Sequence, residues 1–149
     1  MSDTGNSSLP ELKIDQEKLE EYRSIYEELL GFVPPRIQAR TELLGRLDPE
    51  FLSLQEEIRK KGMYPDVFDV KTVQLMLFGM LLLSLRDAAR IHGIAARRAG
   101  ATWEEMQAVV NLAYLYGGLS AANIGAQFLQ EIAKMEAEQE EAGADKGEA

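Results

Sequence analysis

The chain contains one histidine, His92, and no cysteine. Histidine is the side chain whose unperturbed pKa lies nearest neutral pH, so His92 is the first candidate for proton transfer. Its neighbours one helical turn away are Ala88 and Ala89 before it, and Ala95 and Ala96 after it. The imidazole is therefore expected to project over a patch of methyl groups. Such a patch either lets another helix approach closely or leaves room for a ligand.

Arg90 and Asp87, shortly before His92, are two further candidate site residues. Arg90 is a candidate for binding a substrate carboxylate, because a guanidinium donates two parallel hydrogen bonds to such a group. The alternative is an exposed Arg90 that pairs with Asp87, three residues earlier. In a regular helix Asp87 lies about 140° from His92, so it can orient the imidazole only if the helix breaks nearby.

Tyr116 and Gln74 are further candidates for contacting a ligand. Tyr116 stands beside Gly117 and Gly118, where its phenol can donate a hydrogen bond to a ligand oxygen. Gln74 can hold a ligand oxygen or a water molecule. The alternatives are a tyrosine packed in the core and an ordinary polar helix residue. For His92 the alternative is a packed histidine bonded to a backbone carbonyl.

The composition excludes several kinds of chemistry. Without cysteine there is no thiol nucleophile, disulfide exchange or thiolate metal site, and the chain fits a reducing cytoplasm. A metal site takes about three or four convergent ligands, which one histidine without closely spaced carboxylates does not supply. No glycine-rich phosphate loop or dinucleotide fingerprint is present. We therefore expect no metal and no cofactor.

The net charge of −9 is concentrated at the two ends of the chain. Residues 1–32 carry eight acids and three bases, and residues 131–149 carry seven acids and two bases. This distribution disfavours nucleic acid. The segments 1–12 and 136–149 are expected to be disordered tails flanking one domain over 13–135. The most apolar run, residues 75–85, is shorter than the roughly 20 residues of a membrane span, so no membrane insertion is expected.

Apolar periodicity and capping signals predict an all-α, single-domain bundle of about seven helices. The helices are expected to start at Asp15, near Ile37, at Asp48–Pro49, at Asp69, after a break within Ser84–Asp87, at the Thr102–Glu105 capping box, and near Ser120. The run from Leu75 to Leu83 is apolar on all sides, so it must be covered all round. Burial in the bundle or in a subunit interface satisfies this, and we expect a homo-oligomer.

Three segments carry a family resemblance. They are residues 69–75 (DVKTVQL), residues 90–106 (RIHGIAARRAGATWEEM) and residues 113–122 (AYLYGGLSAA). Their order and spacing resemble the carboxymuconolactone decarboxylase family, which includes the alkylhydroperoxidase D-like proteins. In that family a histidine helix runs to a glycine, a Thr-x-Glu-Glu cap opens the next helix, and an aromatic-Gly-Gly turn follows. The resemblance covers about residues 33–132.

The resemblance implies an alkylhydroperoxidase D-like helical fold that assembles as a homotrimer or homohexamer, with pockets near the subunit interfaces. It also implies either cofactor-free decarboxylation of a carboxylated muconolactone or peroxide reduction by a cysteine pair. The positions of that pair, seven and four residues before the histidine, are Leu85 and Ala88 in this chain. A cysteine-dependent peroxidase is therefore excluded.

The chain also lacks two acids of the family. The decarboxylases carry a glutamate where this chain has Ala88, and the acid of the redox branch falls near Val73 and Gln74. The function expected from the resemblance is that of a cofactor-free lyase or isomerase acting on a small carboxylated lactone or related carbonyl compound. His92 and Arg90 would be catalytic, and Tyr116, Gln74 and Asp87 would contact the substrate. The alternative is a non-catalytic helical oligomer that binds a small hydrophobic ligand or a protein partner.

Overall fold

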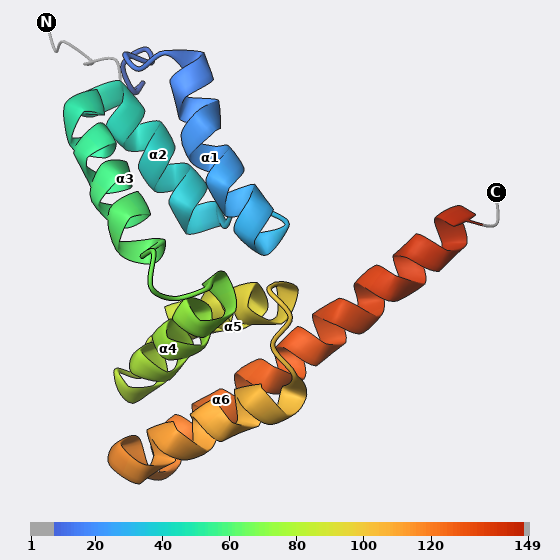
Figure 1. Ribbon diagram of the computed structural model, residues 1–149. Coiled ribbons are helices and arrows are strands. Elements are labelled where there is room, and N and C mark those ends of the chain that lie inside the picture. Colours follow the sequence, from blue (N-terminus) through green and yellow to red (C-terminus); the bar gives the residue numbers. More distant parts are fainter. Residues whose placement is uncertain (1–7, 148–149) are drawn as a thin grey trace, which may run out of the picture. The chain divides into compact units, whose positions relative to one another are not determined.

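The computed structural model describes residues 8–147, and all of its regular structure is helical, which confirms the predicted all-α class (Figure 1). The elements are α1 (Gln16–Leu30), α2 (Pro35–Leu47), α3 (Pro49–Met63), α4 (Val70–Leu83), α5 (Ala88–Arg98) and α6 (Trp103–Gly147). Inside α6, Gly118 has φ 71° and ψ −163°, a conformation essentially restricted to glycine. The chain doubles back there, so α6 consists of two helical segments, 103–117 and 119–147. The prediction of about seven helices agrees with this division.

The helix ends follow local signals in the sequence. The Asp15 carboxylate caps α1, and Gly31 ends that helix in the left-handed region at φ 82°. The Asp69 carboxylate accepts from a backbone amide in the first turn of α4 at 2.7 Å. Thr102 and Glu105 form the predicted capping box, with bonds of 2.9 and 3.1 Å. These four signals explain where α1 begins and ends and where α4 and α6 begin.

A break separates α4 from α5, as the sequence predicts for residues 84–87. Leu85 adopts a left-handed conformation with φ 52°, which bulky residues rarely occupy. The Arg86 amide then donates to the Leu81 carbonyl at 2.9 Å and ties the turn to the end of α4. The break lets α5 leave α4 in a new direction and pack against it.

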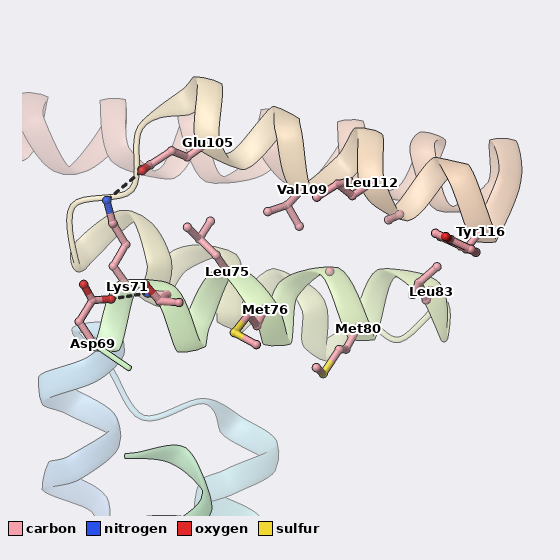
Figure 2. Close-up of a pocket in the computed structure, with 13 residues that line it drawn as sticks. Asp69, Lys71, Leu75, Met76, Met80, Leu83, Glu105, Val109, Leu112 and Tyr116 are labelled. Carbon is pink, nitrogen blue, oxygen red and sulfur yellow. Dashed lines mark hydrogen bonds and ion pairs between the residues drawn. The ribbon is translucent and has the colours of Figure 1, made fainter. Parts of the chain in front are cut away.

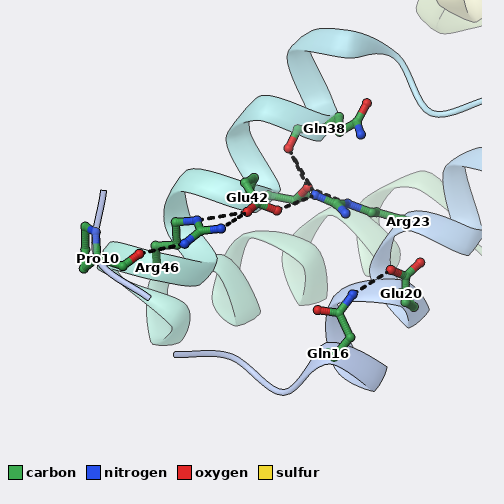
Figure 3. A network of polar contacts seen from close by, with 8 residues as sticks. Pro10, Gln16, Glu20, Arg23, Gln38, Glu42 and Arg46 are labelled. Atoms are coloured by element: carbon green, nitrogen blue, oxygen red, sulfur yellow. Dashed lines mark hydrogen bonds and ion pairs between the residues drawn. The ribbon is translucent and has the colours of Figure 1, made fainter. Parts of the chain in front are cut away.

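The chain divides into two compact units, Met1–Met63 and Tyr64–Ala149. In the first unit a core forms around Leu19, Tyr22 and Leu52, with Leu12, Ile14 and Leu44 packed against it. A polar network links its helices: Arg23 pairs with Glu42 at 3.2 Å, and Glu42 also pairs with Arg46 (Figure 3). Arg46 in turn donates to the Pro10 carbonyl at 2.7 Å, which connects the segment before α1 to α2.

A second polar cluster in the first unit is centred on a buried carboxylate and a buried tyrosine. The Glu56 side chain, 2% exposed, accepts hydrogen bonds from Arg40 and from the Tyr26 hydroxyl, the latter at 3.0 Å. The Arg59 guanidinium stacks over the Tyr26 ring at 3.8 Å, and burial raises the pKa of Tyr26 to about 12. One carboxylate thus faces two guanidinium groups, and its charge is what makes their burial tolerable.

The second unit contains α4, α5 and α6. Its fully buried side chains include Phe78 and Leu82 from α4, Ile94 from α5, and Met106 and Ile132 from the two segments of α6. Gly125 faces Val110, and an added Cβ there would lie 2.8 Å from the Val110 methyl groups. The two segments of α6 therefore run side by side, and α4 and α5 pack against them.

The predicted domain boundaries stay a prediction. Part of the expected N-terminal tail, residues 1–7, lies outside the described residues. At the other end, residues 136–147 continue α6 as a helix, where the sequence analysis expects a disordered tail. Alanine and glutamate favour this helix intrinsically, and Lys134 pairs with Glu138 one turn later, whereas the described side chains beyond residue 136 are exposed.

The buried cluster makes a prediction about stability. Glu56→Ala is expected to lower the free energy of unfolding by about 1–3 kcal/mol, because the buried Tyr26 hydroxyl loses its acceptor and the partly exposed Arg40 and Arg59 lose their counter-ion. Urea denaturation of the full chain, followed by circular dichroism, measures the change. Glu57→Ala, at the exposed neighbouring position of the same helix, is the matched control. Equal stability of the two variants would contradict the role assigned to Glu56.

Candidate functional site

The candidate site centres on a side-chain pair formed by α5 and α4. His92 Nδ1 lies 2.7 Å from Gln74 Oε1, across 18 residues of sequence. Gln74 is fully buried, and His92 is partly buried. Two residues that the sequence analysis selects separately are thus brought into direct contact by the fold.

Small residues on α5 bring this helix close to its neighbours. Ala89 and Ala96 are fully buried, and Gly93 lies between them on the helix. A Cβ added to Gly93 would lie 2.7 Å from Ile132 Cδ1 and 3.4 Å from the Phe78 ring. The small-residue face of α5 is therefore used for close approach to α4 and to the second segment of α6. This approach carries the His92 ring to Gln74.

The contact with Gln74 determines which ring nitrogen carries the proton in neutral His92. An amide oxygen only accepts hydrogen bonds, so Nδ1 must donate. In that tautomer the basic lone pair is on Nε2. The amide contact thereby favours the Nδ1–H form of the neutral ring. Because Gln74 carries no charge, it does this without the electrostatic stabilisation that a carboxylate would give an imidazolium.

Arg90 does not join this pair. Arg90 stands two residues before His92, about 160° around the helix. Its guanidinium lies 3.6 Å from the Glu131 carboxylate of α6. Asp87 is an exposed residue at the start of α5, and its carbonyl accepts from the Arg90 amide at 3.1 Å. The carboxylate-binding role of Arg90 and the substrate contact of Asp87 stay predictions.

Tyr116 lies in a different part of the second unit. Its side chain, 88% exposed, lines a groove between α4 and the first segment of α6 (Figure 2). Gln74 lies on the opposite side of α4 from the groove-lining residues, as the helical angles of Thr72, Leu75 and Gly79 show. The structure therefore does not bring Tyr116 to the His92–Gln74 pair, and its role as a substrate contact stays a prediction.

The sequence analysis missed two features of this unit. Arg97 clamps α5 to α6 through two 2.9 Å bonds to the Glu136 carboxylate, and its guanidinium lies 4.0 Å from the centre of the Trp103 ring. Lys71 pairs with Glu105 at 2.9 Å at one end of the groove. Both pairs join residues more than 30 positions apart, for which helical spacing gives no signal.

None of the helices within residues 8–147 is long and apolar enough to cross a membrane. In the same part of the chain, no group of three or more histidine, cysteine, aspartate or glutamate side chains is arranged to hold a metal ion.

Comparison with known proteins identifies the family. The sequence model of one protein family, the carboxymuconolactone decarboxylase family, matches residues 49–131, which is more than half of the chain. The match includes α3, α4, α5 and the first part of α6, and so contains both Gln74 and His92. Neither a curated protein nor a solved structure gives a significant match to the chain.

The contact between His92 and Gln74 makes a prediction that is testable by nuclear magnetic resonance. In the wild-type chain, long-range proton–nitrogen spectra should show neutral His92 with its proton on Nδ1. Gln74→Leu removes the acceptor and should shift the neutral ring towards the Nε2–H form. It should also destabilise the fold by about 1 kcal/mol, because a partly buried donor loses its partner.

The assignment of these spectra is unambiguous because the chain has a single histidine. Gln107→Leu, at an exposed position of α6, is the control and should leave the ring signals unchanged. A wild-type ring protonated on Nε2 in its neutral form would show that Gln74 does not select the tautomer.

Proposed function

The chain belongs to the carboxymuconolactone decarboxylase family, and from this premise we propose that it is a cofactor-free lyase or isomerase. Its substrate is a small carboxylated lactone or a related carbonyl compound. His92 transfers the proton, and Gln74 positions the His92 ring.

The single observation that carries this proposal is the 2.7 Å contact between His92 Nδ1 and the buried Gln74 amide oxygen. A general acid or base works best when its ring is held in one orientation and one tautomer before the substrate arrives. Gln74 provides this orientation from inside the fold, where its own position is fixed by burial. His92 itself is only partly buried.

In a decarboxylation, the bond between the carboxylate carbon and the lactone ring breaks and carbon dioxide leaves. The electron pair passes into the ring as an enolate conjugated with the lactone carbonyl. Protonated His92 then gives its Nε2 proton to the carbon, and solvent supplies a new proton to the imidazole. Throughout this cycle Nδ1–H stays bonded to Gln74, so only Nε2 changes its protonation state.

In an isomerisation, neutral His92 takes a proton at Nε2 from the carbon next to the carbonyl and returns it to another carbon of the same enolate. Both reactions pass through the same kind of anion, which hydrogen-bond donors fixed in place stabilise best. His92, held in one tautomer by the uncharged Gln74, can serve as the base or acid in either reaction.

Arg90 is proposed to bind the substrate carboxylate. Its guanidinium is about half exposed and stands 3.6 Å from Glu131, a distance longer than a direct hydrogen bond. A carboxylate ligand would therefore compete with Glu131 for Arg90. Asp87 and Tyr116 are also proposed to contact the substrate, although Tyr116 lies in the groove on the other side of α4.

A second candidate function is non-catalytic binding by a helical oligomer. One observation favours it: the two family positions that hold acids are occupied by Ala88 and, near the second, by Gln74. Neither side chain ionises. In this case the His92–Gln74 contact would hold α5 on α4 without taking part in a reaction.

The two candidate functions differ in the effect of changing His92. His92→Gln is expected to lower turnover by about 10²–10⁴-fold, because positioned proton transfer is lost while the ring is replaced by a polar side chain of smaller size. The measurement is carbon dioxide release and loss of lactone absorbance across a panel of carboxylated five-membered lactones.

Arg86→Gln removes an exposed cation just outside α5 and is the control, with wild-type turnover expected. Wild-type rates in the His92→Gln variant would show that His92 does not transfer the proton. An absence of wild-type turnover on the whole panel would favour the non-catalytic candidate.

We further propose that the chain assembles with copies of itself, as a trimer or hexamer. Four exposed apolar residues support this. They lie where α4 ends and α6 doubles back, and we name them the tip patch: Leu85, Tyr114, Leu115 and Leu119. Leu115 and Leu119 are 69% and 70% exposed. Apolar groups concentrated in one exposed region are characteristic of interaction surfaces.

The tip patch predicts how the assembly can be broken. Leu115→Glu combined with Leu119→Glu should reduce the molar mass in solution to that of one chain, because charge would be buried in the interface. Light scattering coupled to gel filtration measures this. Val67→Glu, at another exposed apolar position, should leave the mass unchanged. A wild-type monomer, or a double variant with the wild-type mass, would contradict the proposal.

A further inference from the structure

A groove runs between α4 and the first segment of α6, and its volume is about 570 Å³ (Figure 2). The apolar walls are formed by Leu75, Met76, Met80 and Leu83 from α4 and by Val109 and Leu112 from α6. At one end stand the charged residues Asp69, Lys71 and Glu105. Ligand sites in proteins have this character: a volume of about 300–1,000 Å³, mostly apolar walls and a few polar groups.

The groove is separate from the His92–Gln74 pair. Apart from Lys71 at the charged end, its residues on α4 recur at positions 72, 75, 76, 79, 80 and 83, which form one face of a helix. Gln74 lies about 180° from the centre of that face. A ligand in the groove would therefore contact the opposite side of α4 from the side that holds His92. Binding in the groove is therefore independent of the chemistry proposed for His92.

Small residues and methionines explain the shape of the groove. Gly79 has no side chain, and a Cβ there would lie 3.0 Å from Val109 Cγ1, so α4 and α6 come close together at its floor. Above the floor, Met76 and Met80 remain 42% and 56% exposed. Unbranched thioether side chains adapt to ligands of irregular shape. The groove thus offers an apolar surface that nothing within the second unit covers.

The charged end of the groove has two carboxylates and one ammonium group. Lys71 Nζ lies 2.9 Å from Glu105 Oε1, while Glu105 Oε2 accepts from the Thr102 amide. Asp69 accepts from the Thr72 amide at 2.7 Å. The hydrogen bond from Lys71 lowers the pKa of Glu105, and bonding by Thr72 lowers the pKa of Asp69, so both are charged at neutral pH. The formal charge of this end is negative.

The length of the groove follows from the helix that forms its wall. From Thr72 to Leu83 the α4 axis rises about 16 Å at roughly 1.5 Å per residue. This matches an extended apolar chain or a fused ring system with one polar end. A negative end favours a cationic head group over a neutral one, and disfavours a carboxylate.

We propose that the groove binds an elongated apolar molecule with a positively charged ammonium head group. The head group lies beside Asp69 and Glu105, and the apolar body lies along Met76 and Met80 towards Tyr116. Charge complementarity selects the cation, and the adaptable methionine wall accommodates the body.

Three probes with the same ten-carbon chain test the head-group preference: decyltrimethylammonium, decanol and decanoate. Each is titrated below its micelle concentration into the full chain, and binding is measured by calorimetry. The cation should bind at one saturable site and about tenfold more tightly than decanoate, with decanol between them.

Two conservative substitutions isolate the charge. Asp69→Asn and Glu105→Gln each keep a side chain that can cap its helix, since asparagine is a good N-cap residue and glutamine serves in a capping box. The double variant should therefore stay folded and lose the preference for the cation. Because Lys71 then remains as the only charged side chain at this end, the end becomes formally positive, and decanoate should bind more tightly than decyltrimethylammonium.

A second pair of variants isolates the apolar wall. Met76→Gln with Met80→Gln should weaken binding of all three probes by about tenfold or more, because apolar contact is lost. Val67→Gln with Ile58→Gln alters exposed apolar positions outside the groove and should leave binding unchanged.

Four results would overturn the proposal. They are equal affinity of the wild-type chain for the cation and the anion, binding that does not saturate, binding unaffected by the methionine substitutions, and a wild-type chain that binds no probe because a second copy covers the groove. None of them bears on turnover by His92, so the failure of this proposal and the failure of the proposed function are distinguishable.

Discussion

Helix α5 packs against α4 and α6 through side chains that have almost no bulk, and the rest of the second unit depends on this close approach. Gly93 lies where any Cβ would meet Ile132 and Phe78, and Ala89 and Ala96 are fully buried beside it. Larger residues on this face would push α5 away from α4. The His92 ring would then lose its contact with Gln74, and the helices would no longer enclose Phe78 and Met106. One packing constraint thus controls both the core and the candidate site.

Because α4 is packed on one side and open on the other, its two faces have different properties. The face with Gln74 and Phe78 is buried against α5 and α6. The face with Met76 and Met80 borders the groove and is half exposed. The sequence shows only a run that is apolar all round, from which we expected burial in the bundle or in an interface. The structure divides this run into a core face and a face available to a ligand or partner, which explains its apolar character without requiring that every residue be internal.

The fold was more predictable from the sequence than the site because its signals are local. Asp15, Gly31, Asp69 and the Thr102–Glu105 box each act within a few residues, so the helix ends follow directly from them. The pairing of Gln74 with His92 depends on the direction in which α5 leaves the turn at Leu85, and helical periodicity contains no information about that angle. The separation of Arg90 from His92 was predictable from the sequence. A spacing of two residues places Arg90 on the other side of the helix from His92. The position of Tyr116 in the groove required the tertiary structure.

The central claim is that substrate is bound and turned over at His92. The most direct measurement follows the ring signals of this single histidine by nuclear magnetic resonance while a carboxylated lactone is added to the full chain. The account predicts that the Nε2 signal shifts in a saturable manner, whereas Nδ1 keeps its proton and its bond to Gln74. Saturable shifts of backbone signals elsewhere in the chain, with the His92 ring unchanged, would contradict it.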